Sequence, residues 1–399
     1  MSSGTMLNLP QPSLSRPNTL HVDLDAIAHN VTEIRRVVGA DISIYVALKG
    51  NAYGFGLVPV AQTVLAAGAT ALSVADVADA ITLREHAIDA PILLYPGNLP
   101  TPAVLEALER YDLMPTIVDA DSARTYASAG FRKPLRIFVK VDVGLERLGI
   151  SLKAAAPIVR SIADSPSLIA QGIYTHFHVV DDEDAVEYLE WQFNRFTASI
   201  AELDTLGLAP PTQMAAASGA LAVTTVMNLN AVDPGHLVYG LQPPGPRLVP
   251  LKLRPAFKAL TSRLIQVKPV ARSDFRDKLP FPMTTDIKIG VIPMGKRDGL
   301  LTANAGAAIV RGQACRLGSV DLEHTRIDLT GVPDAQVGDV VVLIGSQQGT
   351  VISLEEVAAH QRVSTLVNVP LAVQESVPRE YTAARPHTDA LPSTTRRGG

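Results

Sequence analysis

The chain between residues 19 and 245 alternates short apolar runs with longer amphipathic segments. The periodicity is clearest in segment 24–38, where Ile27, Val31, Ile34 and Val38 fall on one stripe and predict a helix with one buried face. Segments 77–87 and 187–206 are also predicted as helices. Runs with the length of buried strands lie between the helices, at 42–48, 71–74, 92–95, 135–141, 169–174 and 213–217. This alternation predicts an α/β fold in which 19–245 form a (β/α)8 TIM barrel.

The pattern changes after the proline-rich segment Pro243–Pro250. Short β-type runs separated by turn residues follow, at 264–267, 288–292, 307–310 and 340–344. They predict a smaller, mostly β domain over 255–380. The terminal segments 1–18 and 381–399 are rich in polar residues and proline and show no period, so we predict disordered tails there.

Composition excludes several classes of function. The net charge of −4 argues against binding to nucleic acid or to an anionic membrane. Cys315 is the only cysteine, so an internal disulfide and a cysteine-rich metal site are excluded, and no metal is expected. The sequence has no apolar run long enough to span a bilayer and no recognisable signal peptide. We therefore expect a soluble cytoplasmic protein.

A lysine follows the predicted strand 42–48 directly. Lys49 stands at the end of this strand, and a glycine-rich turn over Gly50–Gly56 comes next. In (β/α)8 barrels the carboxyl ends of the strands carry the catalytic residues. Desolvation there lowers the pKa of a lysine, as a Schiff-base nucleophile requires. Since most lysines at strand ends are solvated, this signal alone does not decide the function.

A series of motifs along the chain favours a catalytic role for Lys49. Val22–Asn30 followed by Leu48–Gly56 resembles the opening of the alanine racemase family. Further segments resemble motifs of the same family in the same order, at Lys140–Ile150, Gly172–Phe177, Ala217–Ser218, Pro234–Leu241, Ile292–Gly299, Val337–Gly345 and Ser376–Arg379. The order of the motifs identifies the chain as a member of this family, which is of fold type III and depends on pyridoxal 5′-phosphate (PLP).

The resemblance implies a role for each matched residue. Lys49 carries PLP as a Schiff base and is also the base on one face of the substrate Cα. Arg147 bridges the phenolic oxygen of the cofactor and the substrate carboxylate, a task suited to a two-pronged cation. His176 lies against the face of the pyridine ring. Lys140 matches a lysine that is often carbamylated, and its carbamate would hold Arg147 in position.

The resemblance also implies a phosphate site. It is formed by Tyr53 and Ser218 together with the backbone N–H groups of Gly235 and His236, because a glycine permits close approach to the phosphate. Tyr239 belongs to the same motif as Gly235 and His236 and is expected at the cofactor as well.

The family pattern breaks at the second base. Alanine racemases use a tyrosine from the partner subunit on the other face of Cα, yet this sequence has no tyrosine between Tyr239 and Tyr381. The position of that tyrosine falls close to Asp277, and the candidate replacements are Asp277, Lys278 and Lys296. The pairing with a partner implies a homodimer with shared active sites.

Other departures surround the expected site. Lys296 stands where the family has the tyrosine of its access channel, Val320 replaces a methionine beside the retained Asp321, and Leu371 replaces a late tyrosine that helps to hold the phosphate. Asp233 stands where the family has an arginine facing the pyridine nitrogen. An aspartate would hold a proton on that nitrogen and strengthen the electron sink.

The sequence thus predicts a PLP-dependent amino-acid racemase or epimerase with an altered second base. Because of Asp233, the alternative function is that of a PLP-dependent decarboxylase or eliminase on the same fold. A catalytically inactive PLP-binding protein is the third alternative, because cofactor sites can persist after activity is lost. The expected substrate is a small amino acid.

Overall fold

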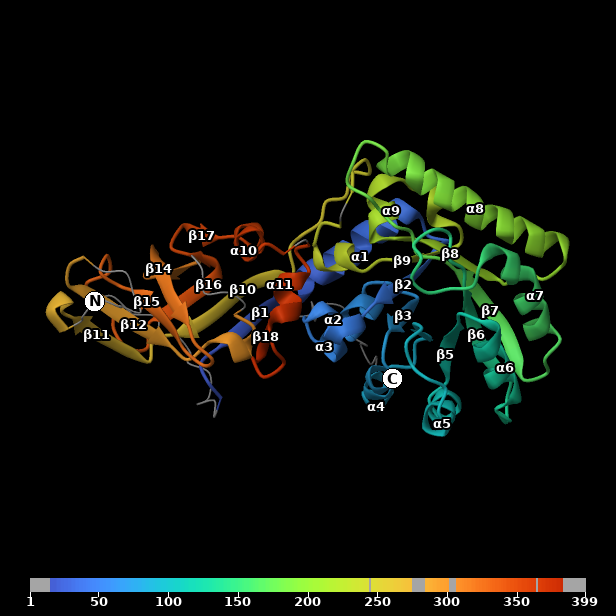
Figure 1. Cartoon of the computed structure of the whole chain (residues 1–399), viewed down its shortest axis with the longest axis horizontal. Helices are drawn as coiled ribbons and strands as arrows, with labels where there is room; N and C mark the ends of the chain where they lie inside the picture. Colours follow the sequence, from blue (N-terminus) through green and yellow to red (C-terminus); the bar gives the residue numbers. More distant parts are fainter. Residues whose placement is uncertain (1–14, 244, 275–283, 301–305, 364, 383–399) are drawn as a thin grey trace, which may run out of the picture.

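The computed structural model describes residues 15–243, 245–274, 284–300, 306–363 and 365–382. Eight parallel strands form a closed barrel at one end of an elongated molecule, and a mostly β domain forms the other end (Figure 1). The barrel strands are β2 (Ser43–Ala47), β3 (Ala71–Val74), β4 (Ile92–Leu94), β5 (Leu113–Ile117), β6 (Leu135–Lys140), β7 (Leu168–Tyr174), β8 (Thr212–Ala217) and β9 (Ala231–Asp233). The predicted fold class, a (β/α)8 barrel with a mostly β domain, is confirmed.

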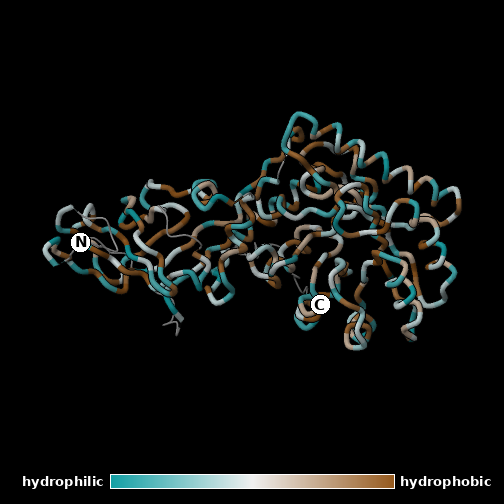
Figure 2. Tube along the Cα trace, viewed as in Figure 1, coloured by the Kyte–Doolittle hydropathy of each residue, from teal (hydrophilic) through white to brown (hydrophobic). Residues whose placement is uncertain are grey.

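Helices cover the outside of the barrel (Figure 1). They are α1 (Leu24–Val38), α3 (Leu57–Ala66), α4 (Val77–Glu85), α5 (Pro102–Arg110), α6 (Ala120–Ser128), α7 (Leu152–Ala163) and α8 (Ala185–Thr205). Two short segments, α2 (Lys49–Tyr53) and α9 (Ser218–Val223), follow strands β2 and β8. The side chain of Asp23 accepts a hydrogen bond from the N–H of Ala26, which caps α1 at the predicted residue. Figure 2 shows apolar and polar positions alternating along the outer helices, as expected for helices with one buried face.

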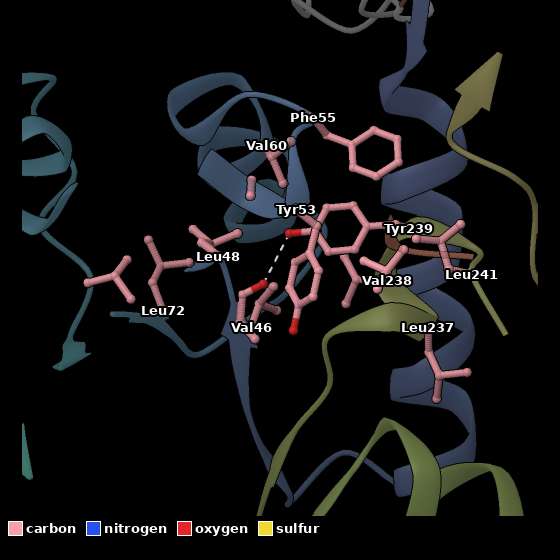
Figure 3. Packing of buried hydrophobic residues seen from close by; sticks show 14 of the residues in the cluster. Val46, Leu48, Tyr53, Phe55, Val60, Leu72, Leu237, Val238, Tyr239 and Leu241 are labelled. Atoms are coloured by element: carbon pink, nitrogen blue, oxygen red, sulfur yellow. Dashed lines mark hydrogen bonds between the residues drawn. The ribbon is translucent and has the colours of Figure 1, made fainter. Parts of the chain in front are cut away.

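The barrel interior is filled by large side chains that alternate along the strands. Tyr45, Leu93, Met114, Phe138, Tyr174 and Met214 form one buried cluster. Outside the barrel, strand β2 and the turn that follows it pack against residues 237–241, as Figure 3 shows. In that region the hydroxyl of Tyr239 donates a hydrogen bond to the carbonyl oxygen of Ala47 at 3.0 Å. These contacts fix the segment that carries Lys49.

The β domain is built on one long sheet. Its path runs in the order β11-β12-β15-β14-β13-β16-β10-β1-β18, and β17 pairs with β16. The strands are β1 (Thr19–Asp23), β10 (Phe257–Arg263), β11 (Gln266–Val270), β12 (Ile287–Ile292), β13 (Ala307–Val310), β14 (Gln313–Val320), β15 (Thr325–Asp328), β16 (Val340–Gln347), β17 (Thr350–Ile352) and β18 (Arg379–Thr382). Helices α10 (Leu354–Gln361) and α11 (Asn368–Ala372) complete the domain.

Strand β1 corrects one predicted boundary. Residues 19–23 were predicted as part of the barrel domain, but β1 pairs with β10 in antiparallel and with β18 in parallel orientation. Its alternating burial provides one buried face for this sheet, and the chain enters the barrel only through α1. Strand β18 also extends to Thr382, so the first two residues of the predicted C-terminal tail are part of the sheet. Most of both predicted tails, 1–14 and 383–399, lies outside the described residues.

Candidate active site

A cavity of about 500 Å³ opens at the carboxyl ends of the barrel strands. Parallel strands deliver their carboxyl ends to the same rim of a barrel, so residues far apart in sequence meet there. Six residues at strand ends or within two residues after them line it: Lys49, Tyr95, Lys140, His176, Ser218 and Asp233. Arg147 and His236 line the cavity as well. The structure thus brings together most of the residues that the sequence singled out.

The turn after Lys49 has an unusual backbone. Residues 50–53 are all in the left-handed region, with φ between 53° and 62°. Only one of the four is glycine, so the turn costs conformational energy and must be held by its surroundings. The β domain supplies two of these contacts: the Arg379 guanidinium donates to the Gly54 carbonyl at 3.1 Å, and the Asn51 amide donates to Glu375 at 3.0 Å. A Cβ on Gly54 would lie 2.4 Å from the Pro370 carbonyl oxygen, so the two segments are in close contact.

Lys49 lies among aromatic rings and charges. Its Nζ is 5.9 Å from the ring centre of Tyr53 and 5.6 Å from that of Tyr95. Burial lowers the pKa of Lys49, nearby Arg147 lowers it further, and Asp233 opposes the change. A lowered pKa increases the fraction of neutral amine, which is the form that attacks a carbonyl group.

Asp233 is hydrogen-bonded to a residue that the sequence analysis did not select. The Tyr95 hydroxyl donates to the Asp233 carboxylate, at 2.5 Å from one oxygen and 2.7 Å from the other. Burial raises the pKa of Asp233 to about 6, against the opposing effects of this hydrogen bond and of Lys49 and Lys140. Tyr95 directly follows strand β4, so its place at a strand end was the available signal.

Ser218, Gly235 and His236 form a second polar group in the cavity lining. The Ser218 hydroxyl accepts hydrogen bonds from the N–H groups of Gly235 at 2.8 Å and of Leu237 at 3.3 Å. A Cβ on Gly235 would lie 2.5 Å from the Tyr53 hydroxyl, so this phenol and the Gly235 backbone are in close contact. Next to them, burial lowers the pKa of His236 to about 4.

Tyr239 lies elsewhere. It is fully buried in the hydrophobic core, its ring stacks on Phe55 at 4.9 Å between centroids, and it does not contribute to the cavity lining (Figure 3). The structure therefore gives Tyr239 a place in the core behind the site.

The loop that carries Arg147 is held by one carboxylate. Asp142 accepts hydrogen bonds from four successive backbone N–H groups, at 2.9 to 3.2 Å, those of Gly144, Leu145, Glu146 and Arg147. Lys140 is only 5% exposed, and burial together with the Arg147 charge lowers its pKa to about 8. Burial likewise lowers the pKa of His176 to about 3, so this imidazole is neutral at physiological pH.

Comparison with known proteins identifies the family of the chain. The sequence profile of the alanine racemase N-terminal domain matches residues 22–243, and that of the C-terminal domain matches residues 259–381. The chain belongs to the alanine racemase family. Members of this family depend on PLP, and the chain is an isomerase of the racemase type.

Individual relatives cover nearly the whole chain. It is 36% identical to an alanine racemase of Geobacillus stearothermophilus, over 92% of this chain and 94% of that protein. It is 35% identical to an alanine racemase of Anoxybacillus flavithermus, over 92% and 95%. The crystal structure of an alanine racemase from Bacillus anthracis with bound L-Ala-P superposes with a TM-score of 0.84 at 30% identity, over 94% and 97%.

The departures from the family pattern have different locations. Lys296 is exposed in the short helix η4 (Lys296–Asp298) of the β domain and does not line the cavity of its own chain. Its backbone N–H donates to the Asp321 carbonyl at 3.0 Å, beside the buried Val320. Leu371 lies on the turn after Lys49, where a Cβ on Gly50 would be 3.0 Å from its Cδ2. Asp277 and Lys278 lie outside the described residues.

The described residues contain neither a candidate metal site nor a helix that could span a membrane. No group of three or more His, Cys, Asp and Glu side chains in this part of the chain is arranged to hold a metal ion. Within the same residues, no helix is both long and apolar enough to cross a membrane.

Proposed function

We propose that this chain is a PLP-dependent amino-acid racemase or epimerase that acts at Cα. The observation that carries the proposal is the position of Lys49, whose pKa is lowered by burial, in a charged cavity at the mouth of an alanine-racemase barrel. Lys49 would bind the cofactor covalently and would move the proton on one face of the substrate Cα. Once bound, PLP supplies an electron sink that stabilises negative charge at Cα.

The cavity residues fit this cofactor. Ser218, Tyr53 and the Gly235 backbone would hold the phosphate together with His236, because hydroxyl and N–H donors suit phosphate oxygens. A residue with a Cβ at position 235 would displace the Tyr53 hydroxyl, and glycine leaves that space open. Asp233 would face the ring nitrogen, and the neutral His176 would lie against the ring.

Arg147 would bind the carboxylate of the substrate. Its backbone is already held by Asp142, so little backbone entropy is lost when the guanidinium engages a ligand. We further propose that Lys140 is carbamylated. Attack of its neutral amine on carbon dioxide releases one proton and replaces a cation beside Arg147 with an anion, which turns a repulsive pair into an ion pair.

Inversion at Cα also requires a proton on the face opposite Lys49. The cavity lining of one chain comes only from residues between Ala47 and Pro243, so its own β domain contributes no lining residue among those described. We therefore propose a homodimer in which the β domain of the partner completes each site. Asp277, Lys278 and Lys296 of the partner subunit are the candidate second bases.

One observation favours a second candidate function. The buried carboxylate of Asp233 would keep a proton on the ring nitrogen and strengthen the electron sink, which suits decarboxylation or elimination. A lyase would need Lys49 on one face only. A PLP-binding protein without turnover would retain the same cavity residues.

The deciding experiment follows the α-hydrogen in heavy water. Purified protein is offered a panel of L- and D-amino acids, and inversion, deuterium at Cα, carbon dioxide and ammonia are measured. We expect a visible cofactor band that borohydride removes, and an inverted amino acid that carries deuterium. The Lys49→Ala variant should lose the band and at least about 10³-fold in turnover. Lys268→Ala, an exposed lysine on β11, is the matched control.

Each other outcome selects another assignment. Carbon dioxide or ammonia without inversion would establish the lyase, and a band without any exchange would establish an inactive binder. Absence of the band would overturn the role of Lys49. Among Asp277→Asn, Lys278→Met and Lys296→Met, loss of inversion with retained one-face exchange identifies the second base. A cofactor-bound monomer in light scattering would refute the shared site.

A further inference from the structure

We propose that Tyr95 is a positioning residue, which holds the Asp233 carboxylate ionised and aimed at the ring nitrogen of the cofactor. The proposal rests on the proposed function, because it takes Asp233 as the partner of that nitrogen. It adds a residue to which neither the sequence motifs nor the comparisons assign a role.

The contact spans part of the barrel mouth. Asp233 ends strand β9 and Tyr95 follows strand β4, and in the closed barrel β2 and β3 lie between these two strands. The hydroxyl nevertheless reaches both oxygens of the carboxylate, at 2.5 and 2.7 Å. A phenol has one proton to donate, so it serves one oxygen at a time and restrains the rotation of the whole carboxylate. Both residues line the cavity, so the pair faces the place of the ligand.

The direction of the hydrogen bond follows from the surroundings. Burial raises the pKa of Tyr95 well above its usual value, and the charge of Asp233 raises it further, so the phenol stays protonated and acts as the donor. The hydrogen bond opposes the effect of burial on Asp233 and favours its charged form. A carboxylate has about four acceptor positions and the phenol occupies one at a time, so acceptor positions remain for the proton of the ring nitrogen. Without the hydroxyl, burial would favour a protonated Asp233, which is a weaker acceptor for that proton.

The ring of Tyr95 makes a separate contact. The Lys49 Nζ lies 5.6 Å from its centre, so the aromatic ring packs beside the lysine while the hydroxyl serves the aspartate. A phenylalanine at position 95 keeps the contact between the ring and Lys49 and removes the hydrogen bond to Asp233. Tyr95→Phe therefore tests the hydroxyl with little change in the shape of the cavity.

The test compares two ligands that differ at the ring nitrogen. Wild-type protein and variants, freed of cofactor, are titrated with PLP and with 1-deazapyridoxal 5′-phosphate, in which C–H replaces that nitrogen. The ratio of the two dissociation constants measures the preference for the nitrogen, and intrinsic differences between the ligands cancel between variants. The variants are Tyr95→Phe, Asp233→Asn and the double variant. Tyr45→Phe is the control, because Tyr45 is a buried barrel phenol outside the cavity lining.

We expect Asp233→Asn to reduce the preference by about 10-fold to 100-fold, the usual effect of a hydrogen bond to a charged group. Tyr95→Phe should reduce it by about 10-fold, and the double variant should resemble Asp233→Asn alone, because residues that act through one contact are not additive. Binding of the deaza ligand should be unchanged in Tyr95→Phe, which shows that the cavity is intact. Tyr45→Phe should keep the full preference.

The outcomes separate this inference from the proposed function. If Asp233→Asn keeps the full preference, Asp233 does not serve the ring nitrogen, and both proposals about it are wrong. If Asp233→Asn loses the preference and Tyr95→Phe keeps it, only the role of Tyr95 is refuted. Equal losses that multiply in the double variant, or equal weakening of both ligands by Tyr95→Phe, would give Tyr95 a merely structural role.

Discussion

The barrel and the β domain hold their charged side chains in different ways. At the barrel mouth, burial shifts the pKa values of Lys49, Lys140, His176, His236 and Asp233, in each case against the charged form. In the β domain, charged residues form ion pairs near the surface, such as Arg311–Asp339 and Arg297–Glu323. Such exposed pairs add little stability, whereas several buried titratable groups in one cavity are typical of an active site.

The residues that depart from the family pattern also differ between the barrel and the β domain. In the barrel, the change at Asp233 comes with a hydrogen-bonded partner, Tyr95, within the same cavity. In the β domain, Lys296 and Leu371 are exposed in the single chain. In the proposed function, the barrel would hold the cofactor and set its electronic state. The β domain would contribute at the edge of the site, in its own chain through Leu371 and in the proposed dimer through the second base of the partner.

The largest effect expected from a small change concerns Gly235. Gly235→Ala would place a Cβ 2.5 Å from the Tyr53 hydroxyl, closer than real contacts allow, so this phenol must leave the proposed phosphate site. We expect PLP affinity to fall by about 100-fold, because a charge-assisted donor and the local backbone geometry are both disturbed. Cofactor titration measures the loss.

Gly331→Ala in the β domain is the control for Gly235→Ala, because its Cβ would meet only Gln313 at an ordinary 3.7 Å. Unchanged affinity in Gly235→Ala would show that the barrel does not bind the phosphate at this point, and the contrast between the domains would lose its main support.

The sequence predicted the local structure of the barrel well. Helix α1 has the predicted bounds because its signals are local: an apolar stripe runs along it, Asp23 caps its start and Gly39 follows its last residue. Strand β1 was recognisable as an extended segment by its alternation, but its partners β10 and β18 follow more than 230 residues later. No local pattern contains that pairing, so residues 19–23 were included in the barrel domain.

In the candidate site, too, contacts between distant residues could not be predicted from local patterns. Lys49 and Asp233 were found because motifs surround them, and their meeting follows from the geometry of a parallel barrel. Tyr95 was missed because it ends an apolar run, and an aromatic residue there resembles an ordinary core residue. Its partner is 138 positions away. Tyr239 belongs to a recognised motif, yet its hydroxyl serves the Ala47 carbonyl in the core.

Asp233 should make the stability of the cofactor-free protein depend on pH. The pKa of Asp233 is raised from 3.8 to about 6 in the folded state, so its contribution to stability is present below pH 4 and is lost as the pH rises to 6. Asp233→Asn cannot ionise and avoids this loss. Relative to wild type, the variant should gain on the order of 2 kcal/mol in the free energy of unfolding between pH 4 and pH 6.5.

Urea unfolding of the two proteins at several pH values measures this difference. The buried histidines contribute equally to both proteins and cancel in the comparison. A difference that is constant with pH, or that narrows as the pH rises, would contradict a buried and desolvated Asp233. The barrel mouth would then resemble the surface of the β domain in its electrostatics.

The smallest effect on PLP affinity is expected from a substitution in the β domain. Leu371 in α11 lies against the turn that begins at Lys49, because its Cδ2 would be 3.0 Å from a Cβ on Gly50. Leu371→Tyr would restore a phenol where the family has one near the phosphate, and we expect PLP affinity to rise by about threefold to tenfold, as for one added hydrogen bond. Leu371→Phe adds the ring without the hydroxyl and is the matched control. If both variants strengthen binding equally, packing alone accounts for the gain, and the edge of the site needs no donor from this domain.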